Sequence, residues 1–291
     1  MGFMFKVAML DLLVERTTFG HEGNLQIVNS LTQYSDVEVW LLTPQMQDGG
    51  VGDGEPKQLQ VEDVPLWEGD FAFSSEEVMI SVNEENGNIV LRRMALPESK
   101  HIESWLKNAQ LDAVYCTGSR RNVSMWEDWM DSAAELLRQS VSLEIPTLGI
   151  CFGHQLLCHA LGGEVERAES KSELVCDLEK TGFGSYDQLF DGIDNLRGLF
   201  THQDHVVKVP EDCIVLATSE HSQNAAIRVC KDEKMLEAYG VQFHPEAYPE
   251  LIQRSLEAGY LTLEESNQLH GEHDGRQILS NFASVVHSMK K

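Results

Sequence analysis

The stretch PTLGICFGHQLLCHALGG, residues 146–163, decides the fold class and the chemistry expected of this chain. It predicts a short apolar strand over 147–150 that runs directly into Cys151, followed at once by a helix. Gly149 and Gly153 stand two residues before and two residues after the cysteine. This Gly-x-Cys-x-Gly arrangement is the thiol version of a nucleophile elbow, which needs glycines because the turn is tight and neighbouring backbone crowds it.

An elbow of this kind places the sulfur of Cys151 at the carboxyl end of a sheet and at the N-terminus of a helix. The helix dipole favours a thiolate there, and the backbone N–H of Phe152 is free to stabilise an oxyanion. A free cysteine is more often an inert packing residue, and Cys158, in mid-helix without flanking glycines, is predicted to be one. The glycines around Cys151 favour a nucleophile instead.

A nucleophilic cysteine needs a base, and the sequence VQFHPE at 241–246 offers one. His244 follows the last strong predicted strand, and Pro245 prevents continued ladder pairing after it. Glu246 can then turn back and accept a hydrogen bond from the imidazole, which would fix its tautomer and support an imidazolium. The predicted catalytic residues are therefore Cys151, His244 and Glu246.

Outward from the elbow, apolar strands alternate with amphipathic helices. This alternation predicts an α/β fold with a doubly wound, mostly parallel sheet. The segment 164–243 is predicted to be mostly β, and helices are expected after residue 248. The other expected elements are strands over 3–10, 37–42 and 112–116, and helices over 22–34, 98–109 and 124–140.

Two segments interrupt this alternation. Residues 43–57 are rich in Gly, Pro and Asp and are predicted to form a loop. Two β-rich runs follow, at 76–82 and 88–94, and the hairpin-type connector NEENG lies between them. These runs mark 57–97 as an inserted or peripheral β element.

The predicted organisation is a domain over 1–250 that carries this β insertion, with a helical extension over 251–291 packed on it. The insertion and the extension either cover the site, dock a partner or build a homodimer. The sequence leaves these three roles open.

Composition limits the partners and the compartment. The chain has 291 residues, with 22 basic and 47 acidic ones and a net charge of −25. Such a surface repels phosphate backbones and anionic lipids, so neither a nucleic-acid nor a membrane partner is expected. No run of about 18 apolar residues predicts a membrane span. The N-terminus is a poor signal peptide, and no cysteine pair has Cys-x-x-Cys spacing, so we expect a protein of the reducing cytoplasm.

The two motifs together carry a resemblance to a known family. GICFGHQ at 149–155 and FHPE at 243–246 resemble the hallmark motifs of the class I (triad-type) glutamine amidotransferases. The chain resembles the stand-alone, GMP-synthase-like members, and the spacing from Cys151 to His244 suits that family. The resemblance covers roughly 100–250 and implies a flavodoxin-like amidotransferase fold.

The resemblance also implies roles for residues outside the two motifs. The segment Thr117-Gly118-Ser119 matches the loop that supplies a second oxyanion donor, so this donor is expected at Gly118 or Ser119, beside that of Phe152. Gln155 matches a residue that contacts bound glutamine. Thr201 and His202 match a segment that meets the amino and carboxylate groups of the substrate.

The implied activity is hydrolysis of the side-chain amide of glutamine, or of a related γ-glutamyl amide, through a γ-glutamyl thioester on Cys151. Ammonia is released and no cofactor is needed. The sequence contains neither a P-loop nor the Ser-Gly-Gly-x-Asp-Ser loop of GMP synthases, so an acceptor for the ammonia would belong to a partner synthetase. An independent hydrolase of γ-glutamyl amines or peptides is the first alternative. A non-catalytic binding module is the second, and the intact triad motifs speak against it.

One pair of adjacent arginines has two competing interpretations. Arg120 and Arg121 depart from the Gly-Gly-Pro-type loop of many fused amidotransferases, and either bind an anionic substrate group or pair with nearby acidic residues such as Glu127 and Asp128.

The segment 202–205 also has two interpretations, one of which is a metal site. His202, Asp204 and His205 are of metal-ligand type, but no matching second cluster accompanies them and thiol chemistry needs no metal, so no metal is predicted. His270 and His273 lie in an acidic stretch and are predicted to face solvent.

Overall fold

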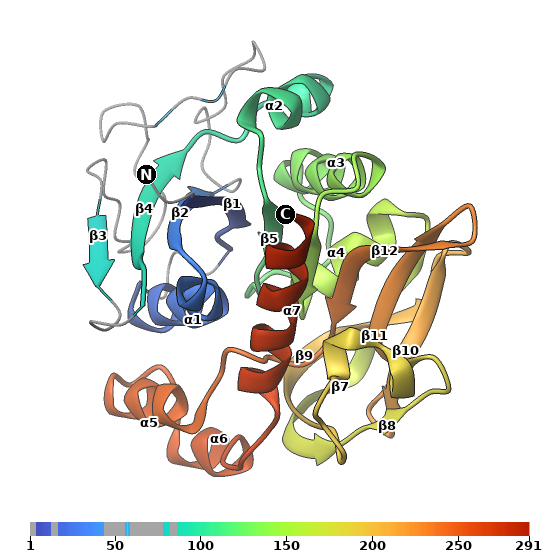
Figure 1. The fold of residues 1–291 in the computed structure, drawn as a ribbon. Helices are drawn as coiled ribbons and strands as arrows, with labels where there is room; N and C mark the ends of the chain where they lie inside the picture. The colour runs from blue at the N-terminus through green and yellow to red at the C-terminus, as the bar shows by residue number, and fades with distance from the viewer. Residues whose placement is uncertain are drawn as a thin grey trace.

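The computed structural model describes residues 4–12, 17–43, 56, 58, 78–81 and 86–290. Its centre is a twisted sheet with helices on both faces (Figure 1). The strands from β4 to β12 in the order below run parallel, and the remaining pairings are antiparallel. In spatial order the strands are β3 (Val78–Ser81), β4 (Asn88–Met94), β2 (Asp36–Leu42), β1 (Met4–Leu10), β5 (Ala113–Cys116), β6 (Thr147–Ile150), β12 (Lys234–Val241), β11 (Ser222–Lys231), β10 (Cys213–Ser219) and β8 (Glu179–Lys180).

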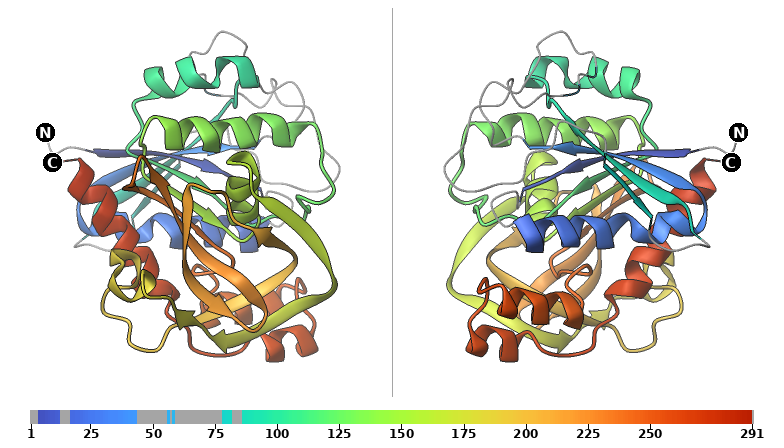
Figure 2. Two further views of the ribbon diagram at one scale, coloured as in Figure 1. Left: turned by 90° about the vertical axis from the view of Figure 1, so that its right-hand side faces the viewer. Right: turned by 90° about the vertical axis from the view of Figure 1, so that its left-hand side faces the viewer.

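Two helical layers sandwich this sheet, as the side views of Figure 2 show. The layer on one face contains α1 (Thr17–Asn29) and α7 (Gly275–Met289). The layer on the other contains α2 (Ile102–Ala109), α3 (Trp129–Ser142) and α4 (Phe152–Ala160). The predicted doubly wound, mostly parallel α/β fold is confirmed.

Strand β1 shows why the central strands read as continuous apolar runs. Phe5, Val7 and Met9 are buried in the core on the α1 and α7 side, whereas Ala8 and Leu10 are buried under the opposite layer. A parallel strand covered on both faces cannot alternate between apolar and polar residues. The sequence pattern of β1 therefore reports its central position in the sheet.

The chain direction across the sheet reverses between β1 and β5. After β1 the chain builds β2 and β4 on one side, and then crosses over to build β5 and β6 on the other. In open α/β sheets, ligands bind in the crevice outside the carboxyl ends of the strands at such a point. Strands β5 and β6 end there at Cys116 and Ile150, directly before the predicted oxyanion loop and the predicted nucleophile.

A two-stranded antiparallel ribbon lies beside this edge. It consists of β7 (Glu164–Asp177) and β9 (Arg197–Lys208), and β7 arcs along one side of the molecule (Figure 2). The register pairs Glu173 with Thr201 and Ser172 with His202, and shifts between Arg167 and Ser172. The ribbon thus carries the predicted substrate residues Thr201 and His202 on β9 and places β7 beside them.

The C-terminal segment folds as the helices expected after residue 248: α5 (Pro249–Glu257), α6 (Leu263–Gln268) and α7. Helix α7 is part of the main core, because Ile278, Leu279 and Phe282 are buried against the sheet. The Phe282 ring meets the rings of Tyr115 and Tyr239 edge-on. The division between a domain and an extension at residue 250 stays a prediction, but the last helix packs on the central strands.

Several element boundaries differ from those expected. The helix predicted over 22–34 is α1, which begins earlier, followed by a 3₁₀ turn over Ser30–Gln33. The helix predicted from residue 124 begins only at Trp129. The cause is tertiary: the Asp204 carboxylate accepts hydrogen bonds from the backbone N–H and the hydroxyl of Ser124, which holds this segment in a turn.

The β element predicted over 57–97 is described only in part. Strand β4 pairs parallel with β2, and β3 pairs antiparallel with β4, so both strands extend one edge of the main sheet. Nearly all of the loop predicted over 43–57 and most of the NEENG connector lie outside the described residues.

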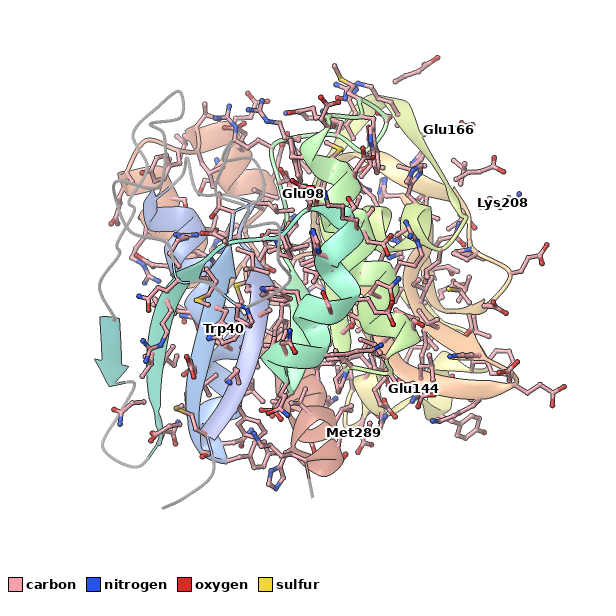
Figure 3. The ribbon with its side chains drawn as sticks, turned by 90° about the horizontal axis from the view of Figure 1, so that it is seen from above. Trp40, Glu98, Glu144, Glu166, Lys208 and Met289 are labelled. Carbon is pink, nitrogen blue, oxygen red and sulfur yellow. The ribbon has the colours of Figure 1, made fainter. Side chains whose placement is uncertain are left out.

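Acidic residues and some of the basic ones populate the outer surface. Figure 3 shows Glu166 and Lys208 at the periphery of the protein, and both are exposed, as is Glu144. No helix among the described residues is long and apolar enough to cross a membrane.

Candidate active site

The elbow around Cys151 has the backbone geometry that its glycines suggested. Cys151 has a φ of 50°, in the left-handed region that residues with side chains rarely adopt. A Cβ on Gly149 would lie 2.5 Å from the carbonyl oxygen of Gly153, and one on Gly153 would lie 2.2 Å from that of Cys116. Both positions require glycine, because strand β6, helix α4 and strand β5 approach each other at backbone distance.

The thiol of Cys151 sits where three elements meet. The Cys151 backbone N–H donates to the carbonyl of Val241 at the end of β12, at 2.8 Å. Its Sγ lies 3.8 Å from the carbonyl oxygen of Thr201 on β9. The residue precedes α4, so the sulfur lies at the N-terminus of this helix, as the elbow predicts.

His244 and Glu246 follow β12 and form a buried pair. Nδ1 of His244 lies 2.8 Å from Oε1 of Glu246, and both residues are buried. The backbone N–H of His244 donates to the carbonyl of Leu199, which fixes the start of this segment against β9. Burial alone would lower the pKa of His244, but the neighbouring Cys151 and Glu246 outweigh it and raise this pKa well above its ordinary value.

The segment Thr117-Gly118-Ser119 lies against the same imidazole. A Cβ on Gly118 would sit 2.8 Å from Cε1 of His244, so the loop touches the ring at backbone distance. The hydroxyl of Thr117 donates to the carbonyl of Leu10 and accepts from the N–H of Leu12, which anchors the loop to the end of β1. The loop therefore occupies a fixed place beside the His244 ring.

A cavity of about 360 Å³ opens over the thiol. It is large enough for a whole small-molecule ligand. All but one of the residues predicted to hold the substrate or the oxyanion line it, and Gly118 instead packs against His244. The predicted site residues that line the cavity are Cys151, His244, Phe152, Ser119, Gln155, Thr201 and His202.

Gln155 and His202 differ in whether their polar side-chain atoms already have hydrogen-bond partners. The side-chain nitrogen of Gln155 donates to the carbonyl of Asp204 at 2.6 Å and to the side-chain oxygen of Gln242 at 3.1 Å. Nδ1 of His202 is buried without a hydrogen-bond partner among the described residues. Burial, helped by neighbouring histidines such as His244, lowers the pKa of His202 to about 3, so this ring is neutral at ordinary pH.

The metal-type residues on β9 do not form a cluster. His202 and Asp204 are buried, whereas His205 alternates to the other face of the strand and is half-buried. The carboxylate of Asp204 is occupied by Ser124. No group of three or more His, Cys, Asp or Glu that could hold a metal occurs in the described part of the chain.

The histidines of the C-terminal segment behave differently from each other. His270 is exposed, as predicted. The prediction for His273 is wrong, because this ring is half-buried and bridges two backbone groups. Its Nδ1 accepts from the N–H of Gly275, and its Nε2 lies 3.0 Å from the carbonyl of Ala247. His273 thus ties the start of α7 to the segment that follows Glu246.

Sequence reasoning missed a large part of the cavity wall. None of these residues belongs to a motif, because the cavity recruits them from the β7–β9 ribbon, from the segment after Ser119 and from the α5–α6 region by tertiary packing. The missed lining residues are Asn122, Arg167, Lys171, Glu173, Leu199, Gln203, Ala247, Ile252, Leu261, Glu265 and Leu269, and Asp204, which the sequence singled out only as a residue of metal-ligand type, lines the cavity as well.

Comparison with known proteins gives a consistent set of relatives. The model of the family described as glutamine amidotransferase class-I matches residues 83–261. A GMP synthase [glutamine-hydrolyzing] subunit from Methanothermobacter thermautotrophicus is 40% identical over 151 residues, which are 50% of this chain and 63% of the relative. A GMP synthase [glutamine-hydrolyzing] from Clostridium novyi is 30% identical over 171 residues, 57% of this chain and 30% of the relative. The chain thus spans less than two thirds of these curated relatives.

Solved structures show the same fold. A glutamine amidotransferase from Thermotoga maritima superposes with a TM-score of 0.59 at 18% identity, covering 99% of both chains. A protein described as a GMP synthase subunit from Thermoplasma acidophilum gives a TM-score of 0.56 at 17% identity, covering 100% of this chain and 98% of the other. At such identities the likeness establishes the architecture.

Proposed function

The chain belongs to the class I glutamine amidotransferases, and from this premise we propose that it hydrolyses the side-chain amide of glutamine, or of a related γ-glutamyl compound, at the cavity over Cys151. The observation that carries the proposal is the buried pair of His244 and Glu246, at 2.8 Å, placed beside a cysteine at a strand-to-helix elbow. A nucleophile, a base and a group that orients the base are the three parts of a triad.

The proposed reaction begins with proton transfer from the Cys151 thiol to Nε2 of His244. The thiolate attacks the δ-carbon of glutamine, and the negative charge moves to the carbonyl oxygen. The backbone N–H of Phe152 and a second donor at Gly118 or Ser119 stabilise this oxyanion. The carbon–nitrogen bond then breaks, and the leaving nitrogen takes a proton from His244 and departs as ammonia. A γ-glutamyl thioester remains on Cys151.

Water completes the cycle. His244, now neutral, accepts a proton from water, and the resulting hydroxide attacks the thioester carbonyl. The carbon–sulfur bond breaks, glutamate leaves, and the thiol is restored. Glu246 holds the Nδ1 proton of His244 throughout, so that Nε2 faces the reacting atoms. Every step uses side chains and backbone groups of this chain, and none requires a cofactor.

Substrate binding is proposed for the remaining predicted residues. His202 offers a buried, neutral ring with an Nδ1 that has no partner among the described residues, and Thr201 presents its carbonyl beside the thiol. These groups suit the amino and carboxylate ends of glutamine. The side-chain nitrogen of Gln155 already donates hydrogen bonds to Asp204 and Gln242. Its proposed contact with the substrate is therefore made by the oxygen of its side-chain amide.

The names of the relatives support a destination for the ammonia. Two of the matched proteins are named as one subunit of a glutamine-hydrolysing GMP synthase, and an enzyme divided into subunits implies a separate partner chain. We therefore propose that this chain supplies ammonia to a synthetase on another chain. Glutamine hydrolysis is then expected to be slow in the isolated protein and faster when the synthetase subunit of a GMP synthase is added.

The proposal is tested by ammonia release from glutamine, with and without that partner, for the wild type and the Cys151→Ala variant. Cys230→Ala, at a half-buried cysteine on β11 that does not line the cavity, is the matched control. Cys151→Ala should abolish release and Cys230→Ala should retain it. Ammonia release that survives in Cys151→Ala would overturn the proposed mechanism.

A further inference from the structure

The cavity over Cys151 extends beyond what a glutamine amide requires. Four basic residues of a chain with net charge −25 line it: Arg120, Arg121, Arg167 and Lys171. A second part of the lining is apolar and comes from Leu199, Ala247, Ile252, Leu261 and Leu269. When glutamine is cut, the group that leaves is ammonia, which offers nothing to either surface.

The basic residues differ in how far they are already paired. Arg121 lies 3.7 Å from Glu127, and Lys171 lies 3.7 Å from Glu173. Arg120 has no hydrogen-bond or ion-pair partner within the part of the chain that the structure describes. Arg120 is thus a guanidinium at the cavity wall with its donors available to a ligand.

Arg167 is held in place by two neighbouring side chains, those of Gln203 and Asp204. It donates to the side-chain oxygen of Gln203 at 2.7 Å, and its guanidinium lies 3.8 Å from the carboxylate of Asp204. That carboxylate already accepts two hydrogen bonds from Ser124. Arg167 therefore keeps an orientation fixed by the protein, which lowers the entropy cost of binding an anion.

The strand register places these cations next to the reacting centre. Thr201, whose carbonyl touches the thiol, pairs with Glu173, and Asp204 pairs with Arg167. Lys171 lies in the irregular stretch between these pairs. Arg120 lies on the loop after β5, the neighbour of the strand that ends directly before Cys151. The basic wall therefore begins one strand away from the sulfur.

Among the described residues, none of the acidic side chains of the lining pairs with Arg120. Glu265 is committed to the start of α6, where its carboxylate accepts from the N–H and the hydroxyl of Thr262. Asp204 is committed to Ser124, and Glu173 to Lys171. Arg120 consequently remains the cation best placed to meet an added carboxylate.

The apolar part of the lining is contributed by the C-terminal region. Ile252 lies on α5, and Leu261 and Leu269 flank α6, where they pack with Leu199 and Ala247. This cluster is separate from the main cores under the sheet. The cavity therefore has a hydrophobic side as well as a basic side.

We infer that this two-sided region is a subsite for the amine part of a γ-glutamyl dipeptide, an amino acid with a free carboxylate and an apolar side chain. The carboxylate would meet Arg120, supported by Arg167 and Lys171, and the side chain would lie on the wall of Ile252, Leu261 and Leu269. The inference rests on the proposed function, because the reacting groups are the same.

The chemistry is that of the glutamine reaction with a different leaving group. The Cys151 thiolate attacks the γ-carbonyl, the isopeptide carbon–nitrogen bond breaks, and the nitrogen takes a proton from His244. The free amino acid departs from the subsite in place of ammonia. Water then hydrolyses the γ-glutamyl thioester to glutamate, and the thiol is restored.

Four substrates test the basic and the apolar parts of the lining separately: glutamine, γ-glutamyl-glycine, γ-glutamyl-leucine and γ-glutamyl-leucinamide. The dipeptide γ-glutamyl-leucine should have the highest kcat/KM. Its leucinamide, which lacks the carboxylate, should be roughly ten- to a hundredfold poorer, as expected for loss of a charge-assisted hydrogen bond. The glycine dipeptide, which lacks the apolar side chain, should be at least about tenfold poorer.

Variants then assign the preference for the carboxylate to the basic wall. In Arg120→Gln/Lys171→Gln, the ratio of kcat/KM for γ-glutamyl-leucine over its leucinamide should fall towards one. Lys208→Gln is the matched control, because Lys208 is likewise an exposed strand lysine paired with a glutamate, and it does not line the cavity. Its ratio should equal that of the wild type.

The outcomes distinguish the inference from the proposed function. If glutamine is hydrolysed in a Cys151-dependent manner but γ-glutamyl-leucine is not, the subsite is refuted and the proposed function stands. Equal turnover of the dipeptide and its leucinamide would also refute the subsite. If neither glutamine nor any dipeptide is cut, with or without the synthetase subunit, the proposed function fails and the subsite fails with it.

Discussion

Nδ1 of His244 and Oε1 of Glu246 lie 2.8 Å apart in the interior of the protein, although only Pro245 separates the two residues in sequence. The chain achieves this by leaving β12 at His244, whose N–H is tied to Leu199, and by turning directly. Gly275 at the start of α7 packs on the Pro245 backbone, where a Cβ would meet the Pro245 oxygen at 2.0 Å. The pair is thus set by its own short segment and braced by the last helix.

Glu246→Gln tests this relationship. The amide keeps the size of the carboxylate but removes the charge that helps to raise the pKa of His244, so the pKa of this histidine should fall. We expect kcat to drop by roughly 10²- to 10⁴-fold, as when the carboxylate of a Ser-His-Asp triad is neutralised. The measurements are steady-state rates of glutamine hydrolysis and NMR titration of the imidazole.

The control for this variant is Glu250→Gln, four residues along the chain, where the carboxylate is largely exposed and pairs with Arg276. It should leave both readouts unchanged. A Glu246→Gln enzyme with wild-type kcat would show that the carboxylate does not support the base.

Gly118→Ala tests the contact between the predicted oxyanion loop and the imidazole. A Cβ would lie 2.8 Å from Cε1 of His244, so either the ring or the loop must move by a few tenths of an ångström. We expect kcat/KM to fall roughly tenfold to a hundredfold, because catalysis is sensitive to small misplacements. Gly182→Ala is the control, since its Cβ would meet nothing within 4 Å. Equal activities of the two variants would contradict the account of this loop.

Phe282→Ala tests whether α7 belongs to the core of the domain. Phe282 is 1% exposed and meets the rings of Tyr115 and Tyr239. Its truncation should lower the free energy of unfolding by about 3–5 kcal/mol, measured by urea denaturation. Met289→Ala, at an exposed position near the end of the same helix (Figure 3), should have little effect. A small loss in Phe282→Ala would indicate that α7 is a dispensable extension.

Acid should destabilise the protein through buried histidines. Burial lowers the pKa of His154 from 6.5 to about 4. The unfolded chain then binds a proton that the folded chain does not, so the stabilisation is complete above about pH 6.5 and is lost as the pH falls towards 4. This histidine alone should cost about 3 kcal/mol over that window.

Unfolding in urea at a series of pH values between 7.5 and 4.5 measures this loss. His154→Gln should flatten the dependence of the free energy of unfolding on pH, because the titrating group is gone. His270→Gln, at an exposed histidine, should keep the wild-type dependence. An unchanged dependence in His154→Gln would assign the acid sensitivity to other groups.

The sequence predicted most of what is determined locally. The elbow at Cys151 and the His-Pro-Glu segment depend on residues within a few positions of each other. Gly149 and Gly153 predict the close approach of backbone segments that the structure contains. The alternation of apolar strands and helices was sufficient to predict the doubly wound sheet, because strands such as β1 are covered on both faces.

What the sequence did not reveal depends on contacts between distant segments. Helix α3 begins late because Asp204, some 80 positions away, holds Ser124 in a turn. His273 is half-buried because it bridges Ala247 and Gly275. The basic and apolar walls of the cavity come from β7 and from the α5–α6 region, and no local pattern marks Lys171 or Leu261 as neighbours of a thiol.

The central claim is that Cys151 is the nucleophile for a γ-glutamyl carbonyl. The most direct measurement is labelling with 6-diazo-5-oxo-L-norleucine, a glutamine-like electrophile, followed by peptide mass spectrometry to locate the adduct. We predict one adduct per chain, on Cys151, with its rate of formation reduced by excess glutamine and lost in Cys151→Ala. An adduct on another of the six cysteines, or an unlabelled Cys151 in folded protein, would contradict the account.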